Sequence, residues 1–93
     1  DALRLASGRL LLAFNDTNSG RANLRLATSR DDGVTWTRGP LIASEPGEEF
    51  SYPFLVQAQD GFIHLAYTWK RRAIQVATFN EAWVDSVANS PVP

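Results

Sequence analysis

The chain has no cysteine, no methionine and almost no net charge, because its nine basic residues balance ten acidic ones over 93 positions. Without cysteine, neither a disulfide nor a thiolate-bound metal can supplement a small core, so packing alone must stabilise the fold. The balanced charge excludes the basic surface typical of nucleic-acid binding. No apolar run approaches the roughly 18 residues of a membrane span. We therefore expect a small globular protein with no nucleic-acid partner and no membrane span.

What the chain does contain is an internal repeat. Residues 3–14 match residues 56–67, with Gly61 on Gly8, an offset of 53 residues (61 minus 8). Residues 24–28 then match residues 74–78 at an offset of 50 (74 minus 24). Self-similarity at this period is typical of repeat architectures, and it indicates two related units in the chain.

Apolar residues recur at every second position inside each unit, at 10, 12 and 14 and again at 63, 65 and 67. This period of two predicts short β-strands, and clusters of Gly, Asp, Asn and Pro predict the turns between them. We predict no helix. The fold class expected is all-β, with about two four-stranded antiparallel blades of a six-bladed β-propeller. Blade one is expected over residues 1–44, blade two over 45–85, and a tail over 86–93.

Two blades do not close a ring, and each would expose an apolar face. The partner expected is therefore the remainder of the propeller, or further copies of the same chain, three of which would make six blades. The start at Asp1 and the absence of methionine favour a processed product or a piece of a longer protein.

Residues 29–36 read Ser-Arg-Asp-Asp-Gly-Val-Thr-Trp and fit the pattern S-x-D-x-G-x-T-W. In a β-hairpin, Asp31 can accept hydrogen bonds from the turn, Gly33 supplies a positive φ and Trp36 packs back on the sheet. The motif resembles the Asp box, the repeat of bacterial neuraminidases (sialidases). That resemblance implies a structural role, far from any sugar site, for Ser29, Asp31, Gly33 and Trp36. We predict no metal and no other cofactor.

The segment just before the Asp box extends this resemblance. Residues 20–31, beginning Gly-Arg-Ala-Asn-Leu, are similar to a pattern in sialidases of glycoside hydrolase family 33. The arginine of that pattern is one of three that hold the substrate carboxylate, so the resemblance implies this role for Arg21. A planar guanidinium suits the task because it grips a carboxylate through two charge-assisted hydrogen bonds. The alternative is an exposed arginine at the start of a strand.

Residues 50–53, Phe-Ser-Tyr-Pro, followed by Asp60-Gly61, resemble the last blade of the same family. The family nucleophile there is a tyrosine, and the direct alignment places Phe50, which has no oxygen, at its position. Tyr52 lies two residues further, and an extended strand would place it on the same face as Phe50. Tyr52 is therefore a candidate catalytic nucleophile, or else an aromatic residue that contacts substrate or packs.

A basic hairpin over residues 67–74 resembles that of a subgroup of sialidase-like bacterial proteins. Trp69, Arg71 and Arg72, together with Lys70, could line a site for an anionic sugar, with the indole stacked on the sugar ring. The alternative is a solvated hairpin tip with one packed tryptophan. His64 is expected to pack between blades rather than act as acid or base. Asn15-Asp16-Thr17 is an N-glycosylation sequon, relevant only in a eukaryotic secretory setting.

The resemblance as a whole implies the C-terminal part of a sialidase-like glycoside hydrolase that removes terminal sialic acid, or a related acidic sugar, from glycans. The alternatives are a glycan-binding propeller without catalysis and a structural Asp-box propeller. The family's catalytic Asp and Glu and two further arginines come from earlier blades, so these 93 residues alone are expected to be inactive. A secreted or periplasmic location is expected, and the absence of cysteine is also compatible with the cytoplasm.

Overall fold

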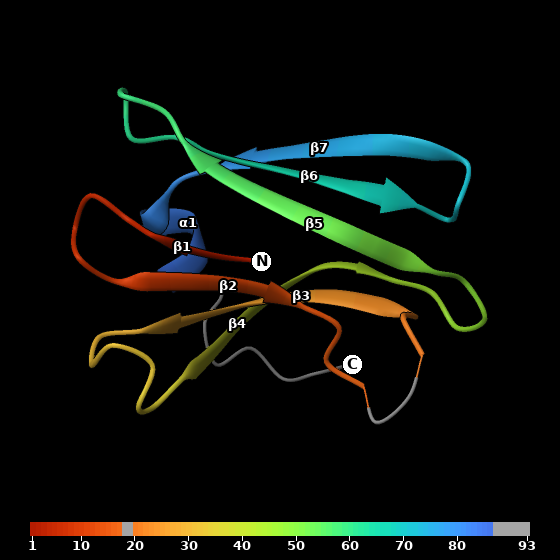
Figure 1. Ribbon diagram of the computed structural model, residues 1–93, viewed down its shortest axis with the longest axis horizontal. Helices are drawn as coiled ribbons and strands as arrows, with labels where there is room; N and C mark the ends of the chain where they lie inside the picture. The colour runs from red at the N-terminus through yellow and green to blue at the C-terminus, as the bar shows by residue number, and fades with distance from the viewer. Residues whose placement is uncertain (18–19, 87–93) are drawn as a thin grey trace.

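The computed structural model describes residues 1–17 and 20–86, and it is built from two antiparallel β-sheets that lie face to face (Figure 1). Each strand in a sheet pairs with the strand that follows it along the chain. The first sheet contains β1 (Ala2–Arg4), β2 (Leu10–Phe14), β3 (Asn23–Ser29) and β4 (Thr37–Ser44), and the second contains β5 (Phe50–Gln57), β6 (Ile63–Trp69) and β7 (Ala73–Phe79).

The all-β class and the antiparallel blades predicted from the sequence are confirmed, with two corrections. Within the described residues the second sheet has three strands, not four. After β7 the chain instead forms a short helix, α1 (Glu81–Ser86), where no helix was predicted. The side chain of Asn80 explains the change, because its Oδ1 accepts a hydrogen bond from the backbone N–H of Trp83 at 2.9 Å and so caps the helix. Of the predicted tail, residues 87–93 lie outside the described part.

The hydrophobic core lies between the two sheets. Residues at alternate positions of β2 and β3 point toward alternate residues of β6, as the period of two requires. Leu11, Leu24, Leu26, Ile63 and Leu65 are all fully excluded from solvent. Burying side chains of this size contributes about 1.5–3 kcal/mol each, so apolar packing between the two sheets is the main source of stability.

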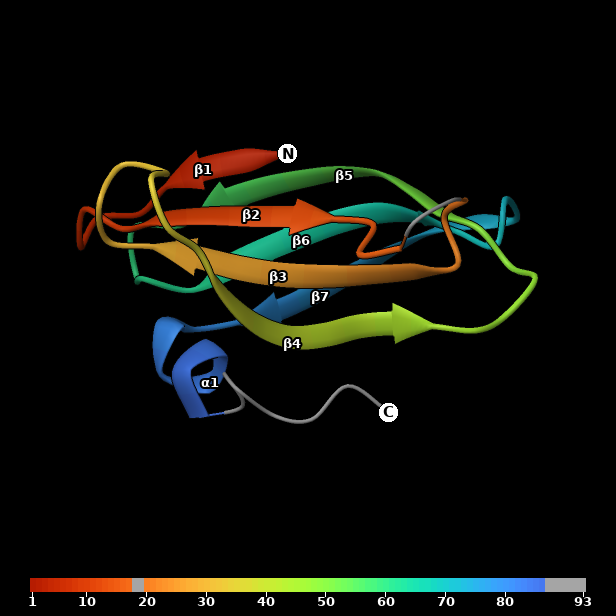
Figure 2. The same ribbon diagram turned by 90° about the horizontal axis from the view of Figure 1, so that it is seen from below.

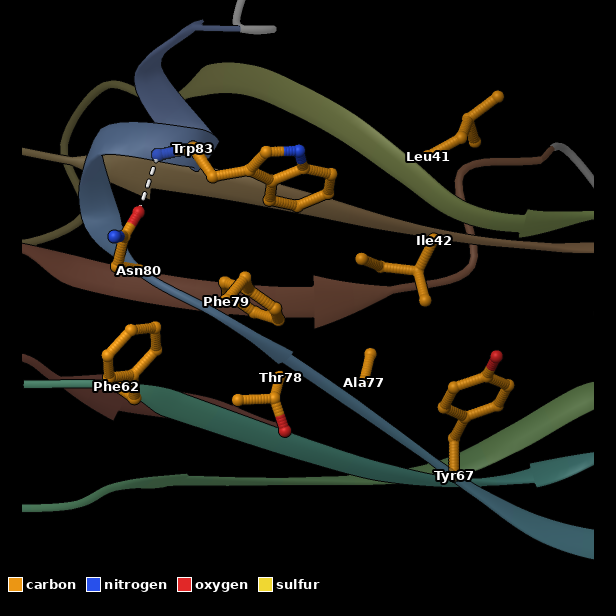
Figure 3. Close-up of a pocket in the computed structure, with 9 residues that line it drawn as sticks. All are labelled: Leu41, Ile42, Phe62, Tyr67, Ala77, Thr78, Phe79, Asn80 and Trp83. Carbon is orange, nitrogen blue, oxygen red and sulfur yellow. Dashed lines mark hydrogen bonds between the residues drawn. The ribbon is translucent and has the colours of Figure 1, made fainter.

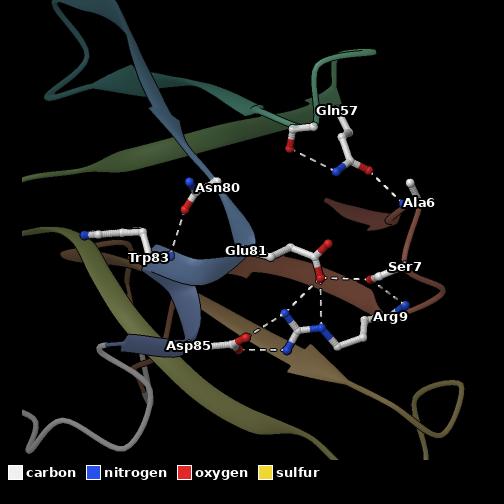
Figure 4. Close-up of polar contacts among 9 residues, drawn as sticks. Ala6, Ser7, Arg9, Gln57, Asn80, Glu81, Trp83 and Asp85 are labelled. Atoms are coloured by element: carbon white, nitrogen blue, oxygen red, sulfur yellow. Dashed lines mark hydrogen bonds and ion pairs between the residues drawn. The ribbon is translucent and has the colours of Figure 1, made fainter.

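A partly buried ion-pair cluster fastens α1 to the first sheet (Figure 4). The Arg9 side chain, which is 10% exposed, donates to Glu81 Oε1 from Nη2 at 2.8 Å and to Asp85 Oδ1 from Nη1 at 2.8 Å. The hydroxyl of Ser7 donates to the same Glu81 oxygen. Figure 2 shows the helix beside the edge formed by β4 and β7, where its Val84 is buried. The cluster therefore joins segments more than 70 residues apart.

The connections between strands gather at two opposite ends of the molecule (Figure 1). The loops β2–β3, β4–β5 and β6–β7 lie at one end, which we call the loop end. The hairpin turns β1–β2, β3–β4 and β5–β6 lie at the other, which we call the turn end. Within residues 1–17 and 20–86, no helix is long and apolar enough to cross a membrane.

Candidate functional site

Arg21 and Tyr52, which the sequence predicted separately as site residues, lie together at the loop end. The Arg21 Cζ atom is 5.5 Å from the centroid of the Tyr52 ring, the geometry of a cation–π contact. The backbone carbonyl of Arg21 also accepts a hydrogen bond from the N–H of Phe50 at 2.8 Å. Both side chains are exposed, and Arg21 forms no ion pair with any residue that the structure describes. Its guanidinium is therefore available to an incoming anion.

A β-bulge turns Tyr52 out of the sheet. The β5–β6 register shifts between Ser51 and Phe54, and Tyr52 has a φ of 53°, in the left-handed region that side chains other than glycine rarely adopt. As a result Tyr52 is 76% exposed while Phe50 is 2% exposed. The expectation that both lie on one face of an extended strand was wrong, because the bulge interrupts the alternation. Such strain costs on the order of 1–3 kcal/mol and concentrates at functional sites.

Phe50 itself belongs to the core. Its ring packs edge-on against Tyr67, with ring centroids 6.5 Å apart and an interplanar angle of 67°. The next residue, Ser51, is also buried, and its Oγ has no hydrogen-bond partner among the described residues. The position that the family resemblance assigns to the nucleophile is thus occupied by a packed phenyl ring. Of the two tyrosines, Tyr67 is buried in the core, so Tyr52 is the one whose phenol is open to solvent.

The loop that carries Arg21 is held by polar side chains that sequence reasoning did not assign to the site. The Asn15 Nδ2 atom donates to the backbone carbonyls of Asn23, at 2.6 Å, and Phe50, at 2.9 Å. Asn23 in turn accepts from the Asp16 N–H through Oδ1 and donates to the Asp16 carbonyl through Nδ2. The Nδ2 atom of Asn15 is also the atom to which a glycan would be attached at this sequon. In the folded chain that atom is used in two hydrogen bonds, so the sequon acts as a structural tie. The role of Asn15 becomes evident only from these two hydrogen bonds, and the sequence carries no signal for it.

The basic hairpin lies at the same end, but much of its charge is compensated. Lys70 forms an ion pair with Glu45 and also lies over the Trp69 ring, with Nζ 4.6 Å from the centroid. The Arg71 Nε atom is 3.5 Å from a carboxylate oxygen of Glu49. Trp69 is half-buried and packs against the core. Arg72 is exposed and forms no ion pair with the part of the chain that the structure describes. Of the three basic residues of this hairpin, Arg72 is therefore the one whose charge is not compensated by a described carboxylate and can meet an anionic ligand.

The Asp-box segment forms the β3–β4 turn at the turn end, away from Arg21 (Figure 1). The Asp31 carboxylate accepts hydrogen bonds from the Thr35 N–H at 2.9 Å, the Thr35 hydroxyl at 2.6 Å and the Ser29 hydroxyl at 2.8 Å. These bonds, the Thr35 hydroxyl first, lower the pKa of Asp31 to about 2. Gly33 has a φ of 91°, and its carbonyl accepts from the Trp36 indole at 3.0 Å. Every strong contact of Asp31 is made inside the turn.

Comparison with protein families identifies this arrangement. A family model described as a BNR repeat-like domain matches residues 1–65, which include the whole first sheet, its Asp-box turn and β5. The chain belongs to the BNR repeat-like domain family. Domains of this family occur in sialidase-like proteins. Neither the curated proteins nor the solved structures provided a match to the chain.

The chain also has a cavity that lies away from Arg21 and Tyr52. A cavity of about 510 Å³ opens between β4, β7 and α1 (Figure 3). Its walls are mainly apolar and include Leu41 and Ile42 from β4, Ala77 and Phe79 from β7, and Trp83 from α1. It contains none of the predicted sugar-site residues. Within residues 1–17 and 20–86 of this BNR domain, no three His, Asp or Glu side chains converge as a metal site would require.

Proposed function

We propose that this BNR domain contributes the Arg21–Tyr52 pair to a sialidase-like site for a terminal sialic acid or a related acidic sugar. The observation that carries the proposal is the cation–π contact at the loop end between an exposed, strained tyrosine and a guanidinium that forms no ion pair with the described residues. Membership of a family found in sialidase-like proteins supports the choice of substrate class.

The chemistry of the pair suits an acidic sugar. The cation–π contact holds the Arg21 guanidinium over the Tyr52 ring without an ion pair to any described carboxylate, so a substrate carboxylate can bind it through two parallel hydrogen bonds. A neutral phenol beside that carboxylate can approach the anomeric carbon without the repulsion that an anionic nucleophile would meet. In the hydrolase version of the proposal, Tyr52 is that phenol. The exposed Arg72 adds a second cation at the same end.

A second candidate is glycan binding without cleavage, and the burial of Phe50 favours it. The position aligned with the family nucleophile holds a core phenyl ring, and Tyr52 would have to act from a shifted register. The remaining family groups, a catalytic Asp, a Glu and two arginines, must come from other blades in either case. Both candidates place the glycan on Arg21, so they differ only in what Tyr52 does.

The first experiment measures binding by titrating the chain with N-acetylneuraminic acid and, as a control ligand, with its methyl ester, which lacks the carboxylate charge. We expect weak binding of the acid, none of the ester, and loss of binding in Arg21→Ala. Arg30→Ala, a matched control at a variable position of the Asp box, should bind normally. Equal binding of acid and ester, or unchanged affinity in Arg21→Ala, would remove Arg21 from the site.

The second experiment separates hydrolase from binder. The chain alone should release no fluorophore from a fluorogenic sialoside, because the other catalytic groups are missing. In an assembly with the complementary blades, turnover abolished by Tyr52→Phe supports hydrolysis. Binding with no turnover in that assembly supports the second candidate.

A further inference from the structure

The second sheet has a face that the rest of the described chain leaves uncovered. It is the face turned away from the first sheet, and we call it the outer face. Strand register places Val56, His64 and Thr78 in one row across it, and Phe54, Ala66 and Val76 in the next. The large apolar side chains on it are open to solvent: Phe54 is 62% exposed, Val56 43%, Ile74 67% and Val76 62%. An apolar group of this kind usually marks an interface.

The internal repeat indicates what this face is built to contact. At the offset of 50, Ile74 and Val76 are the counterparts of Leu24 and Leu26 in the first sheet. Leu24 and Leu26 are 0% exposed, because the second sheet covers them. The outer face of the second sheet is therefore the counterpart, in the repeat, of the inner face of the first sheet. Within this molecule that inner face is covered by a β-sheet.

The complementary surface is present on the opposite side of the molecule. In β2, Leu11 and Ala13 point into the core, so Leu10, Leu12 and Phe14 point away from it. At the offset of 53 these three residues are the counterparts of Ile63, Leu65 and Tyr67. Those are the β6 residues that cover the first sheet in the core. The molecule thus presents counterparts of both partners of its own internal interface, one on each side. On the β2 side the register also places Arg25 beside Phe14, and Arg25 is paired with Asp16.

We propose that the outer face of the second sheet binds the first sheet of a second copy of this chain, head to tail, by the contact that joins the two sheets within one molecule. The two rows named above contain no carboxylate, lysine or arginine, and the two arginines on the facing side of the first sheet, Arg25 and Arg38, are both paired with Asp16. A head-to-tail contact propagates, and it gives a closed ring where the rotation permits and an open chain where it does not. The half-buried His64 lies within the interface, at the position of Leu11 in the repeat.

This contact is independent of the proposed sugar site, although the two adjoin. Tyr52 lies on β5 just before Phe54, so a docked sheet forms a wall beside the Arg21–Tyr52 pair. Loss of sugar binding on Arg21→Ala tests the sugar site. Loss of self-association on changing the outer face tests only the interface.

Sedimentation velocity of the wild-type chain, from about 1 μM to about 1 mM, covers the range of weak specific contacts. We expect the mass to rise with concentration. Val76→Lys should be monomeric throughout, while Val34→Lys, at an 80% exposed valine in the Asp-box turn, should associate like wild type. Circular dichroism checks that each variant folds. A wild-type monomer at the highest concentration, or equal association of Val76→Lys and wild type, would overturn the proposal.

Mixing two variants tests the head-to-tail geometry. Val76→Lys blocks the outer face of the second sheet, and Leu12→Lys blocks the opposite side of the molecule. Each variant alone should be monomeric, but a mixture should form 1:1 heterodimers, because one intact face of each kind remains. If Leu12→Lys alone still dimerises, the contact is symmetric and the head-to-tail proposal fails. If folded variants show no association in the mixture, it fails as well.

Discussion

The guanidinium of Arg21 lies over the ring of Tyr52, with 5.5 Å between the Cζ atom and the ring centroid, although the two residues lie 31 positions apart (52 minus 21). Two features bring them together. The carbonyl of Arg21 is tied to the backbone of β5, and the bulge in β5 turns Tyr52 outward. Each feature can be tested by the stability of variants, without any sugar present.

The strain at Tyr52 predicts an unusual order of stabilities. Glycine inside a strand is normally less stable than alanine by about 0.5–1 kcal/mol. At a φ of 53° the preference reverses, because alanine keeps a Cβ in the left-handed region and glycine does not. Tyr52→Gly should therefore be more stable than Tyr52→Ala by about 1 kcal/mol in urea unfolding. If the glycine variant is no more stable than the alanine variant, the bulge is not strained.

The tie made by Asn15 should matter for both stability and the site. Asn15→Ala leaves the carbonyls of Asn23 and Phe50 without their side-chain donor, at a cost of about 1–3 kcal/mol. Asn15→Asp should cost more, because it keeps the shape but places an oxygen anion against two carbonyl oxygens. Urea unfolding gives the order of stabilities, and titration with N-acetylneuraminic acid should show weakened binding in the folded Asn15→Ala variant. An Asn15→Asp variant as stable as wild type would contradict this account.

The ion-pair cluster at α1 predicts an asymmetry between its partners. Arg9 is 10% exposed, whereas Glu81 is 26% and Asp85 49% exposed. Removing both acids leaves a buried charge unpaired, while Arg9→Met leaves two acids that water can reach. The Glu81→Ala/Asp85→Ala double variant should therefore be destabilised more than Arg9→Met, by about 1–3 kcal/mol in thermal or urea unfolding. The reverse order would show that Arg9 acts mainly through its aliphatic stem.

The Asp-box turn should lose order in acid at an unusually low pH. The pKa of Asp31 falls from 3.8 to about 2, so the turn favours the ionised carboxylate. The resulting stabilisation is complete above pH 4 and is lost as the pH falls toward 2. The NMR shift of the Trp36 indole N–H should follow that loss, and Asp31→Asn should remove its pH dependence over this window. A midpoint near 4 would mean that the Thr35 and Ser29 hydrogen bonds do not form in solution.

Much of the fold was predictable because it depends on local patterns. The alternation at residues 10–14 and 63–67 located β2 and β6, and the Asp-box spacing located the β3–β4 turn. The helix α1 was missed because six residues give no helical period, and its stability comes from Asn80 and from the distant Arg9.

The site was less predictable, because its decisive features are not local. The resemblance selected Arg21 and aligned Phe50 with the nucleophile, so Tyr52 became a candidate only through its place two residues later, and nothing in the sequence indicated its contact with Arg21. The bulge at Tyr52 depends on the pairing with β6, and the role of Asn15 depends on a carbonyl 35 residues away. The neutralisation of Lys70 and Arg71 likewise comes from Glu45 and Glu49, across a loop. Pairing between segments distant in sequence decides which candidate residues remain available to a ligand.

The most direct test of the central claim, that the Arg21–Tyr52 pair binds an acidic sugar, is an NMR titration of the labelled chain with N-acetylneuraminic acid that follows the arginine Nε–H and tyrosine ring signals. We predict saturable shifts at Arg21 and Tyr52, with Arg30 at the turn end unchanged. Shifts that are absent at Arg21, or that centre on the Asp-box turn, would contradict the account.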